Sequence, residues 1–443
     1  MSELHSSIAS DTPVLSAPEP QSASIVERWY VLIMMCLVYT LSIADRYVVS
    51  TVLDPIRHDL HLSNFGVSVL TGMAFGVFYI VLGFPLSWLI DRYNRRKIIG
   101  VCLVLWSIMT ALCGLARNWI EFFLARVGVT VGEAGGTPGA NSLLSDYFPA
   151  TRRAMALTVF SLGAPIGAWL GYNVAGAIAD DYGWRAVFYA LGIPGVLAGA
   201  AVWITVREPA RGCLDAGKEA LAPSVEATMR FMWEQRAAVH TMMGTAVCAL
   251  WGWGLMFWTP TFLQRTYHLT VGQAGDVTQN MHLWGGGLAT VATGWLMARS
   301  TMVDARRIVW LLAAGIGIAT IASGVVYWTR DLAVAKAALW IFVPSIYFYI
   351  GPGFGLLNNL APCRMRAMFC AMVLFLANLG NLVITPNVIG ALNDWLQRYR
   401  LSETDALRLA MLCIVPTGFW ATAHLYLAAR DILKDQERAR EYV

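Results

Sequence analysis

The chain has 443 residues, of which 57% are hydrophobic and only 14% are charged, and its formal net charge is +4. Soluble domains typically carry about 25% charged residues. The composition therefore excludes an ordinary soluble protein and indicates an integral membrane protein. Basic residues form no stripe outside the short loops between apolar runs, which excludes a nucleic-acid-binding protein.

The cysteines and histidines predict no cofactor. Most of the eight cysteines lie inside apolar runs without CxxC spacing, and we interpret them as small buried side chains. The seven histidines form no HExxH motif. His58 and His61 stand three residues apart in a polar loop, but no cysteine or further histidine lies close by in the sequence. We therefore expect neither a metal nor another cofactor.

The chain begins with a polar segment. Residues 1–27 are rich in Ser, Ala and Pro, which predicts a disordered tail. This tail lacks the basic start of a signal peptide, and the apolar run after it is too long for one. We expect that run to remain in the protein as its first membrane span.

Apolar runs long enough to cross a bilayer, about 20 residues each, then recur in two sets of six around a polar interval at 207–236. The sequence therefore predicts an all-α membrane protein with twelve transmembrane helices in two six-helix halves, residues 28–206 and 237–430, followed by a tail at 431–443. The predicted spans are 29–50, 65–90, 97–116, 120–145, 154–178, 184–206, 238–260, 275–298, 307–328, 336–359, 367–390 and 406–428.

Lysine and arginine concentrate in alternate short loops, which predicts the orientation of the chain in the membrane. These loops share one side with the interval 207–236 and with both ends of the chain, so we expect both termini and the central linker to be cytoplasmic. The basic residues of these loops are Arg92, Arg95, Arg96 and Lys97, then Arg152 and Arg153, then Arg299, Arg306 and Arg307, then Arg364 and Arg366.

An internal repeat supports the division into two halves. After the second span the chain reads "SWLIDRYNRR" (Ser87–Arg96), and after the eighth it reads "GWLMARSTMVDARR" (Gly294–Arg307). Each is a small residue, an aliphatic turn and a basic loop at the equivalent place in its half. Duplicated halves are typical of secondary transporters, whose substrate site lies between the halves near the middle of the membrane.

Three charged residues stand out inside the predicted spans: Asp45 in the first, and Arg126 and Glu133 in the fourth. A charge at the bilayer centre costs at least about 2.5–3.5 kcal/mol, and intramembrane charges usually face a bundle interior or a water-filled cavity. Arg126 and Glu133 are seven residues apart, close to two helical turns or about 10.5 Å along one face. Asp45 and Arg126 lie at similar depth and are expected to meet.

Two interpretations of these charges remain open. In one, they respond to a proton or a substrate, because making and breaking the contact as the halves rock would tie protonation to conformation. In the other, they are a structural ion pair between spans one and four. Four glycines of span four would let a neighbouring helix or a ligand approach closely: Gly128, Gly132, Gly135 and Gly136.

Other polar residues in the spans are weaker candidates for a cavity wall. Arg46 follows Asp45 directly, and the others fall in the second half, where they could instead satisfy helix–helix hydrogen bonds. These candidates are Arg46, His282, Asn358, Asn378 and Asn381.

The loop "DRYNRR" (Asp91–Arg96) resembles the cytoplasmic signature between spans two and three of the major facilitator superfamily, although Ser87 and Asn94 stand where glycines are common. Its Tyr-Asn pair is similar to the spinster-like branch of that superfamily. Four further stretches over both halves also resemble spinster-like transporters: "ADRYVVSTVLDPI" (Ala44–Ile56), "RVGVTVGEA" (Arg126–Ala134), "VREPARG" (Val206–Gly212) and "FWTPTFLQR" (Phe257–Arg265).

The resemblance implies the major facilitator fold, alternating access, and coupling and substrate roles for the aspartate of span one and the arginine and glutamate of span four. In this sequence those residues are Asp45, Arg126 and Glu133. We assign the signature loop to conformational gating, with a purely topogenic role of its arginines as the alternative. The gating residues would be Asp91, Arg92, Arg95 and Arg96.

The resemblance also implies which classes of substrate to expect. Animal spinster-like members export lysolipids and sphingolipid phosphates, and the related anion:cation symporters, which share a similar "GEA" on span four, import small organic anions. We therefore predict a monomeric secondary transporter of the bacterial inner membrane or a plasma membrane, working by proton-coupled alternating access. Its partners would be protons, the bilayer and a small-molecule or lipid-like anion, amphipathic or organic.

Three alternatives stay open. The first is a proton/organic-anion symporter, which the direction of transport would distinguish from an exporter. The second, a membrane-embedded lipid enzyme, would need a nucleophile beside the charged residues, and none is near them in the sequence. The third, a channel, would need a ring of charges where this sequence has a local cluster.

Overall fold

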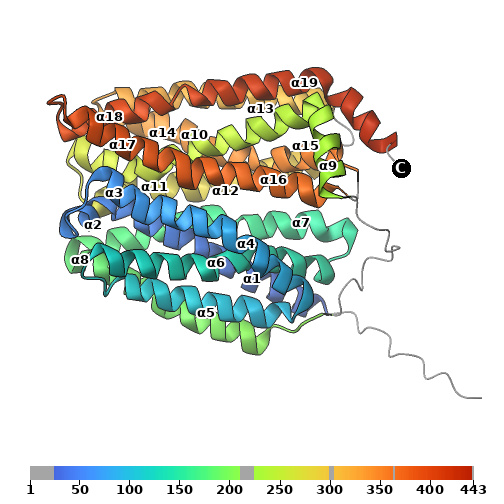
Figure 1. Cartoon of the computed structure of the whole chain (residues 1–443), viewed down its shortest axis with the longest axis horizontal. Coiled ribbons are helices and arrows are strands. Elements are labelled where there is room, and N and C mark those ends of the chain that lie inside the picture. Colours follow the sequence, from blue (N-terminus) through green and yellow to red (C-terminus); the bar gives the residue numbers. More distant parts are fainter. Residues whose placement is uncertain (1–23, 210–223, 299–303, 363–364, 442–443) are drawn as a thin grey trace, which may run out of the picture.

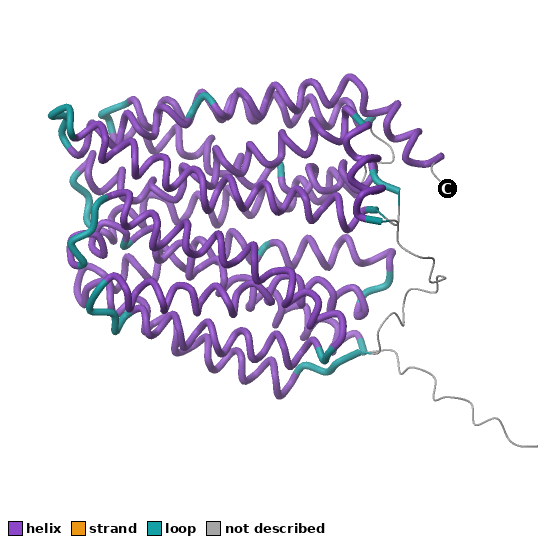
Figure 2. The backbone as a smooth tube through the Cα atoms, in the orientation of Figure 1, coloured by secondary structure: helices purple, strands orange, loops and turns teal. Residues whose placement is uncertain are grey.

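The computed structural model describes residues 24–209, 224–298, 304–362 and 365–441. Within these ranges every regular element is a helix, and Figure 2 shows the connecting loops at the two ends of the helical bundle. The predicted disordered tail lies mostly outside the described residues. Its last residues already belong to the first helix, whose N-terminus is capped by the Ser24 hydroxyl.

The first half contains six membrane crossings. The π-helical turn η1 interrupts the second crossing, and α8 contains the end of the fifth and all of the sixth. Its elements are α1 (Ile25–Thr51), α2 (Leu53–Asp59), α3 (Asn64–Ser68), η1 (Val69–Met73), α4 (Ala74–Arg92), α5 (Arg95–Cys113), α6 (Trp119–Tyr147), α7 (Ala150–Ser161) and α8 (Gly163–Thr205).

The second half repeats this arrangement, with π-helical turns in its second and fifth crossings. Its elements are α10 (Arg236–Tyr267), α11 (Val271–Asn280), η2 (Met281–Gly286), α12 (Gly287–Ala298), α13 (Ala305–Trp328), α14 (Leu332–Phe348), α15 (Ile350–Leu360), α16 (Arg366–Asn378), η3 (Leu379–Ile384), α17 (Thr385–Gln397), α18 (Glu403–Ile414) and α19 (Thr417–Glu441).

Nine helical segments of the described residues are long and apolar enough to cross a membrane. One of them, 155–205, contains two crossings, because Gly183 at φ 77° breaks α8 in a conformation that only glycine adopts easily. The charged helix α6 and the combined α11–α12 segment supply the others. The described chain therefore has the twelve transmembrane helices in two halves that the sequence predicts.

Helices occupy parts of the predicted linker and of the predicted tail. The interval 207–236 contains a helix of its own, α9 (Val225–Glu234), which the Ser224 hydroxyl caps. The predicted tail at 431–443 continues α19 as a helix to Glu441. The sequence predicted a linker and a tail at these two places and assigned no secondary structure to either.

The two halves lie side by side (Figure 1). We call the end of the bundle that holds the C-terminus and the start of α1 the terminal end, and the opposite end, with α2 and the start of α18, the distal end. Close helix packing sets the register inside the first half. A Cβ at Gly167 of α8 would lie 2.5 Å from the carbonyl oxygen of Thr40 on α1, so only glycine permits this approach.

Candidate functional site

The charged residues of spans one and four form a buried ion pair. The guanidinium of Arg126 on α6 donates from Nη1 to Oδ2 of Asp45 on α1 at 2.8 Å, and the Thr110 hydroxyl of α5 donates to the other carboxylate oxygen at 2.9 Å. Both charged side chains are at most 3% exposed. The prediction that Asp45 and Arg126 meet is confirmed.

A second ion pair lies beside the first. Arg46 donates to Oε2 of Glu133 from Nε at 3.1 Å and from Nη2 at 2.9 Å. Glu133 is fully buried, whereas the Arg46 side chain is 24% exposed. Two successive residues of α1 therefore pair with two residues of α6 that lie about two turns apart, and Arg46, a secondary candidate from the sequence, belongs to the centre of the site. We call Asp45, Arg46, Arg126 and Glu133 the charge cluster.

Aromatic rings of α4 hold the two arginines in place. The Arg46 guanidinium lies over the rings of Phe75 and Tyr79, 4.9 and 5.1 Å from their centroids, and that of Arg126 lies 5.3 Å from the Phe75 centroid. A desolvated cation–π contact contributes about 2 kcal/mol. Phe75 thus contacts both cations of the cluster, and sequence analysis did not single it out. Its i,i+4 spacing to Tyr79 on span two is the only signal that pointed to it.

The cluster is not fully satisfied. Arg126 Nε and Glu133 Oε1 are buried and have no hydrogen-bond partner among the described residues. An unsatisfied buried polar atom costs about 1–3 kcal/mol, and the cost is greater for a charged group. A group that hydrogen-bonds to either of these two atoms would therefore stabilise the charge cluster.

The glycines of α6 pack against a helix. A Cβ at Gly132 would lie 2.6 Å from both the Cys102 carbonyl oxygen and the Trp106 Cβ of α5, and one at Gly128 would lie 2.6 Å from Met109. Of the two roles that the sequence left open, these glycines serve helix packing. They bring α5 close enough for Thr110 to reach the cluster.

His282 contacts both halves. It lies in the π-helical turn η2, is fully buried, and its Nδ1 is 2.7 Å from the Tyr347 hydroxyl of α14. Its ring also packs against Tyr47 of α1 and Tyr172 of α8, with centroids 4.9 and 5.3 Å apart. The sequence left a cavity wall and helix–helix hydrogen bonding open for His282, and in this structure aromatic side chains surround it on several sides. We call these four residues the aromatic cluster.

The asparagines of the second half are not gathered in one place. Asn358 accepts a hydrogen bond from the Cys370 thiol at 3.3 Å, which is a helix–helix contact between α15 and α16. Asn378 ends α16 and is half-buried. Asn381 lies in η3, where its Oδ1 is buried without a partner among the described residues. For Asn358 the structure favours the helix-packing alternative over a cavity wall.

The signature loop joins elements within the first half. Buried Arg95 pairs with Asp146 at the end of α6 at 2.5 Å and with Glu208 after α8 at 2.7 Å. Arg96 donates to the Val206 carbonyl, and exposed Arg92 lies over the Trp88 ring. The side chain of Asp91 lies outside the described part of the structure. These contacts fasten three helix ends of one half to each other at the terminal end.

Charged contacts between the halves gather at the distal end. Asp54 accepts from Arg265 of α10 at 2.5 Å and from Arg57 at 3.0 Å, while Arg57 and Arg265 both reach Glu403. Asn64 donates to Asp394 at 2.7 Å. We call this set the distal latch: Asp54, Arg57, Asn64, Arg265, Asp394 and Glu403.

The latch fixes the charge of Asp54, which lies outside the membrane-spanning segments. Burial alone would raise the pKa of Asp54, but hydrogen bonds and charge from Arg265 and Arg57 outweigh it and hold the pKa below its usual range. Sequence analysis missed the latch. Asp54 lies near the end of one stretch that carries the resemblance and Arg265 ends another, but the sequence does not show that the two residues meet.

Together these features define the class of protein. The protein is a multi-pass integral membrane protein whose two six-helix halves meet at a buried aromatic cluster and a charged latch, with a charge cluster inside one half. The Major Facilitator Superfamily matches residues 35–385, and the chain belongs to this family.

Similar proteins agree with this assignment. The chain is 29% identical over 423 residues to an MFS-type efflux pump of Mycolicibacterium smegmatis, covering 92% of this chain and 95% of that protein. It is 24% identical over 443 residues to a probable L-galactonate transporter of Escherichia coli, covering 96% and 95%. A solved bacterial homolog of the human lysosomal transporter spinster, inward-facing and unoccupied, matches with a TM-score of 0.80 and 28% identity, covering 93% and 99%.

These relatives are transporters. The chain is therefore a spinster-like transporter of the superfamily and not an enzyme, and the alternative of a membrane-embedded lipid enzyme is wrong.

Proposed function

We propose that this transporter couples the movement of protons to that of an amphipathic or organic anion by alternating access. The observation that carries the proposal is the charge cluster: two carboxylates and two guanidinium groups inside the membrane, paired at 2.8 and 2.9 Å. Intramembrane charges are costly and mark substrate or proton pathways by default.

The charge balance of the cluster indicates how coupling would work. Its formal charges sum to zero, and adding an anion alone would leave a net buried charge, which is expensive in a low-dielectric interior. A proton on Asp45 or Glu133 removes one negative charge and frees one arginine. Proton and monovalent anion then bind together without changing the net charge.

The exposed fractions of Arg46 and Arg126 indicate which of the two arginines contacts the anion first. Arg46 is 24% exposed and Arg126 is 2% exposed. We therefore assign the first contact with the anion to Arg46, and the contact that forms after a pair has opened to Arg126. The unsatisfied Arg126 Nε is available to donate to that anion.

The contacts between the halves support alternating access. The distal latch and the aromatic cluster both join residues of the two halves, so a rocking motion that opens the distal end must break both. We propose that the terminal end, with its basic loops, is cytoplasmic, and that the protein works as a monomer.

A second candidate within this class is a proton/organic-anion symporter that imports its substrate. The similarity to a probable L-galactonate transporter favours a small organic acid, whereas the similarity to a spinster homolog favours an amphipathic lipid-like anion. The charge balance is compatible with both, because either substrate presents one anionic group.

Transport in proteoliposomes tests the proposal. Purified protein would be assayed with L-galactonate and lysophosphatidylglycerol under an imposed pH gradient, with uncharged monoacylglycerol as the substrate control and Arg117→Gln, an exposed arginine outside the cluster, as the variant control. We expect anion transport that a pH gradient accelerates. Uptake driven by an inward proton gradient is the expected result, because proton and anion bind together. Proton counterflow driven by substrate would identify an exporter and would contradict the charge balance of the cluster. Transport of the uncharged lipid at the same rate would contradict the proposal.

A further inference from the structure

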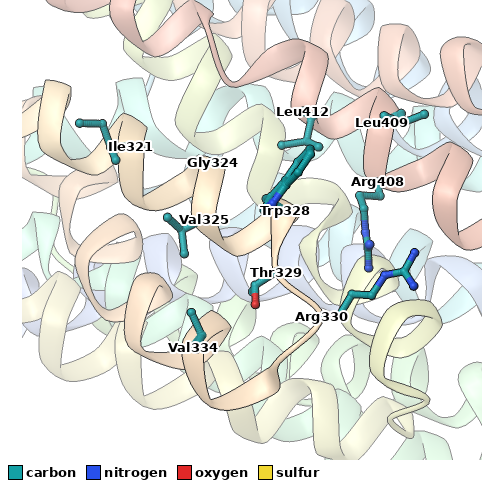
Figure 3. A pocket seen from close by; sticks show the side chains of 10 residues that line it. All are labelled: Ile321, Gly324, Val325, Trp328, Thr329, Arg330, Val334, Arg408, Leu409 and Leu412. Carbon is teal, nitrogen blue, oxygen red and sulfur yellow. The ribbon is translucent and has the colours of Figure 1, made fainter.

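An open groove lies between α13 and α18 on the outer surface of the second half, apart from the charge cluster (Figure 3). Its volume is about 970 Å³, which is at the upper end of the 300–1,000 Å³ range of small-molecule sites. The cause of the groove is local. Pro416 separates α18 from α19, and α13 packs along α19 but touches α18 only weakly.

The wall of the groove is apolar and unusually exposed. Ile321 is 61% exposed, Val325 is 38% exposed, and Trp328, at the last position of α13, is 74% exposed. These helices cross the membrane, so this surface faces acyl chains. A tryptophan at a helix end is typical of the level where acyl chains meet head groups.

Two arginines lie together at the distal end of the groove. Figure 3 shows the guanidinium groups of Arg330 and Arg408 at one end of the pocket, with Ile321 and Val325 toward the other. Among the described residues, Arg330 pairs with Asp405 alone, at 3.5 Å. Arg408 forms no hydrogen bond or ion pair with a described residue, and its Nε is buried without a partner.

Of the two acidic residues nearby, Asp331 accepts from two backbone N–H groups as the cap of α14. Asp405 pairs with Arg330 at 3.5 Å through one oxygen, while its other oxygen accepts from the Ser402 hydroxyl. Guanidinium groups bind phosphate oxygens through short, charge-assisted and often bidentate hydrogen bonds. An apolar groove at acyl-chain depth that ends in two such donors matches a phosphate joined to a hydrocarbon chain.

We propose that this groove is a binding site for an anionic glycerophospholipid of the distal leaflet. Its phosphate contacts Arg408 and Arg330, and one acyl chain lies along Val325 and Ile321. A lipid in this position bridges α13 and α18, the helices that pack weakly at this end.

Native mass spectrometry of the delipidated full-length protein in detergent tests the site. The probes are dioleoylphosphatidylglycerol, dioleoylphosphatidylcholine, dioleoylglycerol and inorganic phosphate. We expect one phosphatidylglycerol to bind at least tenfold more tightly than any other probe. Equal binding of phosphatidylglycerol and dioleoylglycerol, or of free phosphate and the lipid, would overturn the proposal.

Variants locate the site. Arg330→Gln with Arg408→Gln should lower the phosphatidylglycerol affinity at least tenfold. Arg398→Gln is a matched control, since Arg398 also lines a distal groove beside a tryptophan, Trp395, but next to Asp394. Equal loss in the control, or no loss in the double variant, contradicts the assignment.

A separate variant tests whether an acyl chain occupies the groove. It also keeps the proposal testable if the double variant does not fold. Gly324→Trp adds a ring at a residue that lines the groove and leaves both arginines unchanged in sequence. The backbone has room for the side chain, because the nearest atom to a Cβ there is Val415 Cγ1 at 3.6 Å. We expect Gly324→Trp to exclude the lipid at an unchanged melting temperature. Lipid binding at the wild-type level, or a wild-type dimer that this variant dissociates, would overturn the proposal, the latter because a second copy of the chain would then cover the groove.

Discussion

The pair formed by Asp45 and Arg126 allows structural and functional roles to be separated. Asp45→Asn keeps the shape of the side chain and an oxygen that accepts from Thr110, but it leaves Arg126 without a carboxylate. Arg126→Gln leaves the opposite charge unpaired. The double variant replaces the ion pair with a neutral hydrogen-bonded pair.

The structure sets the size of the effect. Both side chains are at most 3% exposed, so removing one partner leaves an uncompensated buried charge, at a cost of about 3–5 kcal/mol. Arg126 keeps its contact with the Phe75 ring in Asp45→Asn, which places that variant near 3 kcal/mol. Replacing both partners removes the unpaired charge and should recover most of the loss, a coupling that a double-mutant cycle measures.

The assay is thermal unfolding in detergent together with proteoliposome transport of the same four proteins. We expect the double variant to regain stability but not transport, and Arg126→Gln to transport the anion with an apparent affinity at least tenfold lower. If the double variant regains transport at the wild-type rate with unchanged pH dependence, the pair is structural and the coupling argument is refuted.

Three further predictions concern the cluster, the latch and helix packing. Glu133→Gln leaves the cluster with one net positive charge, so calorimetry should show anion binding at least tenfold tighter and less dependent on pH; unchanged affinity at pH 6 and 8 would contradict the charge balance. Because the pKa of Asp54 is lowered, its contribution to distal closure is present above its usual pKa and is lost only as pH falls through the lowered value, below about 4. Spin-label distances across the distal end should thus not change from pH 8 to 5, but Arg265→Gln should lengthen them at every pH; opening at pH 5 in the wild type would refute this. Gly132→Ala should lower the melting temperature because its Cβ meets backbone at 2.6 Å, whereas Gly83→Ala, with no atom within 4 Å, should not; equal stability of the two variants would exclude the packing argument.

The sequence predicted the helix count and the pairing of Asp45 with Arg126, because apolar run length and helical depth are local properties of the chain. It did not predict that Glu133 takes Arg46 as its partner. That choice depends on the rotation of α1 about its own axis, and α1 packs closely against α8 at Gly167.

The sequence did not predict the contacts of the distal latch for a related reason. Arg265 and Asp54 are 211 residues apart and each reads as an ordinary loop charge. Only the relative placement of the two halves brings them together. The burial of His282 follows from the same placement, since two of the rings around it come from the first half.

The ratio of protons to anions moved by wild-type protein and by Asp45→Asn tests the central claim most directly. Proteoliposomes with a trapped pH-sensitive dye would report proton movement while labelled anion is counted in the same vesicles. We expect a fixed ratio in the wild type that collapses, with loss of gradient-driven accumulation, in Asp45→Asn. Anion accumulation by the wild type that persists after an uncoupler has removed the pH gradient would contradict the account.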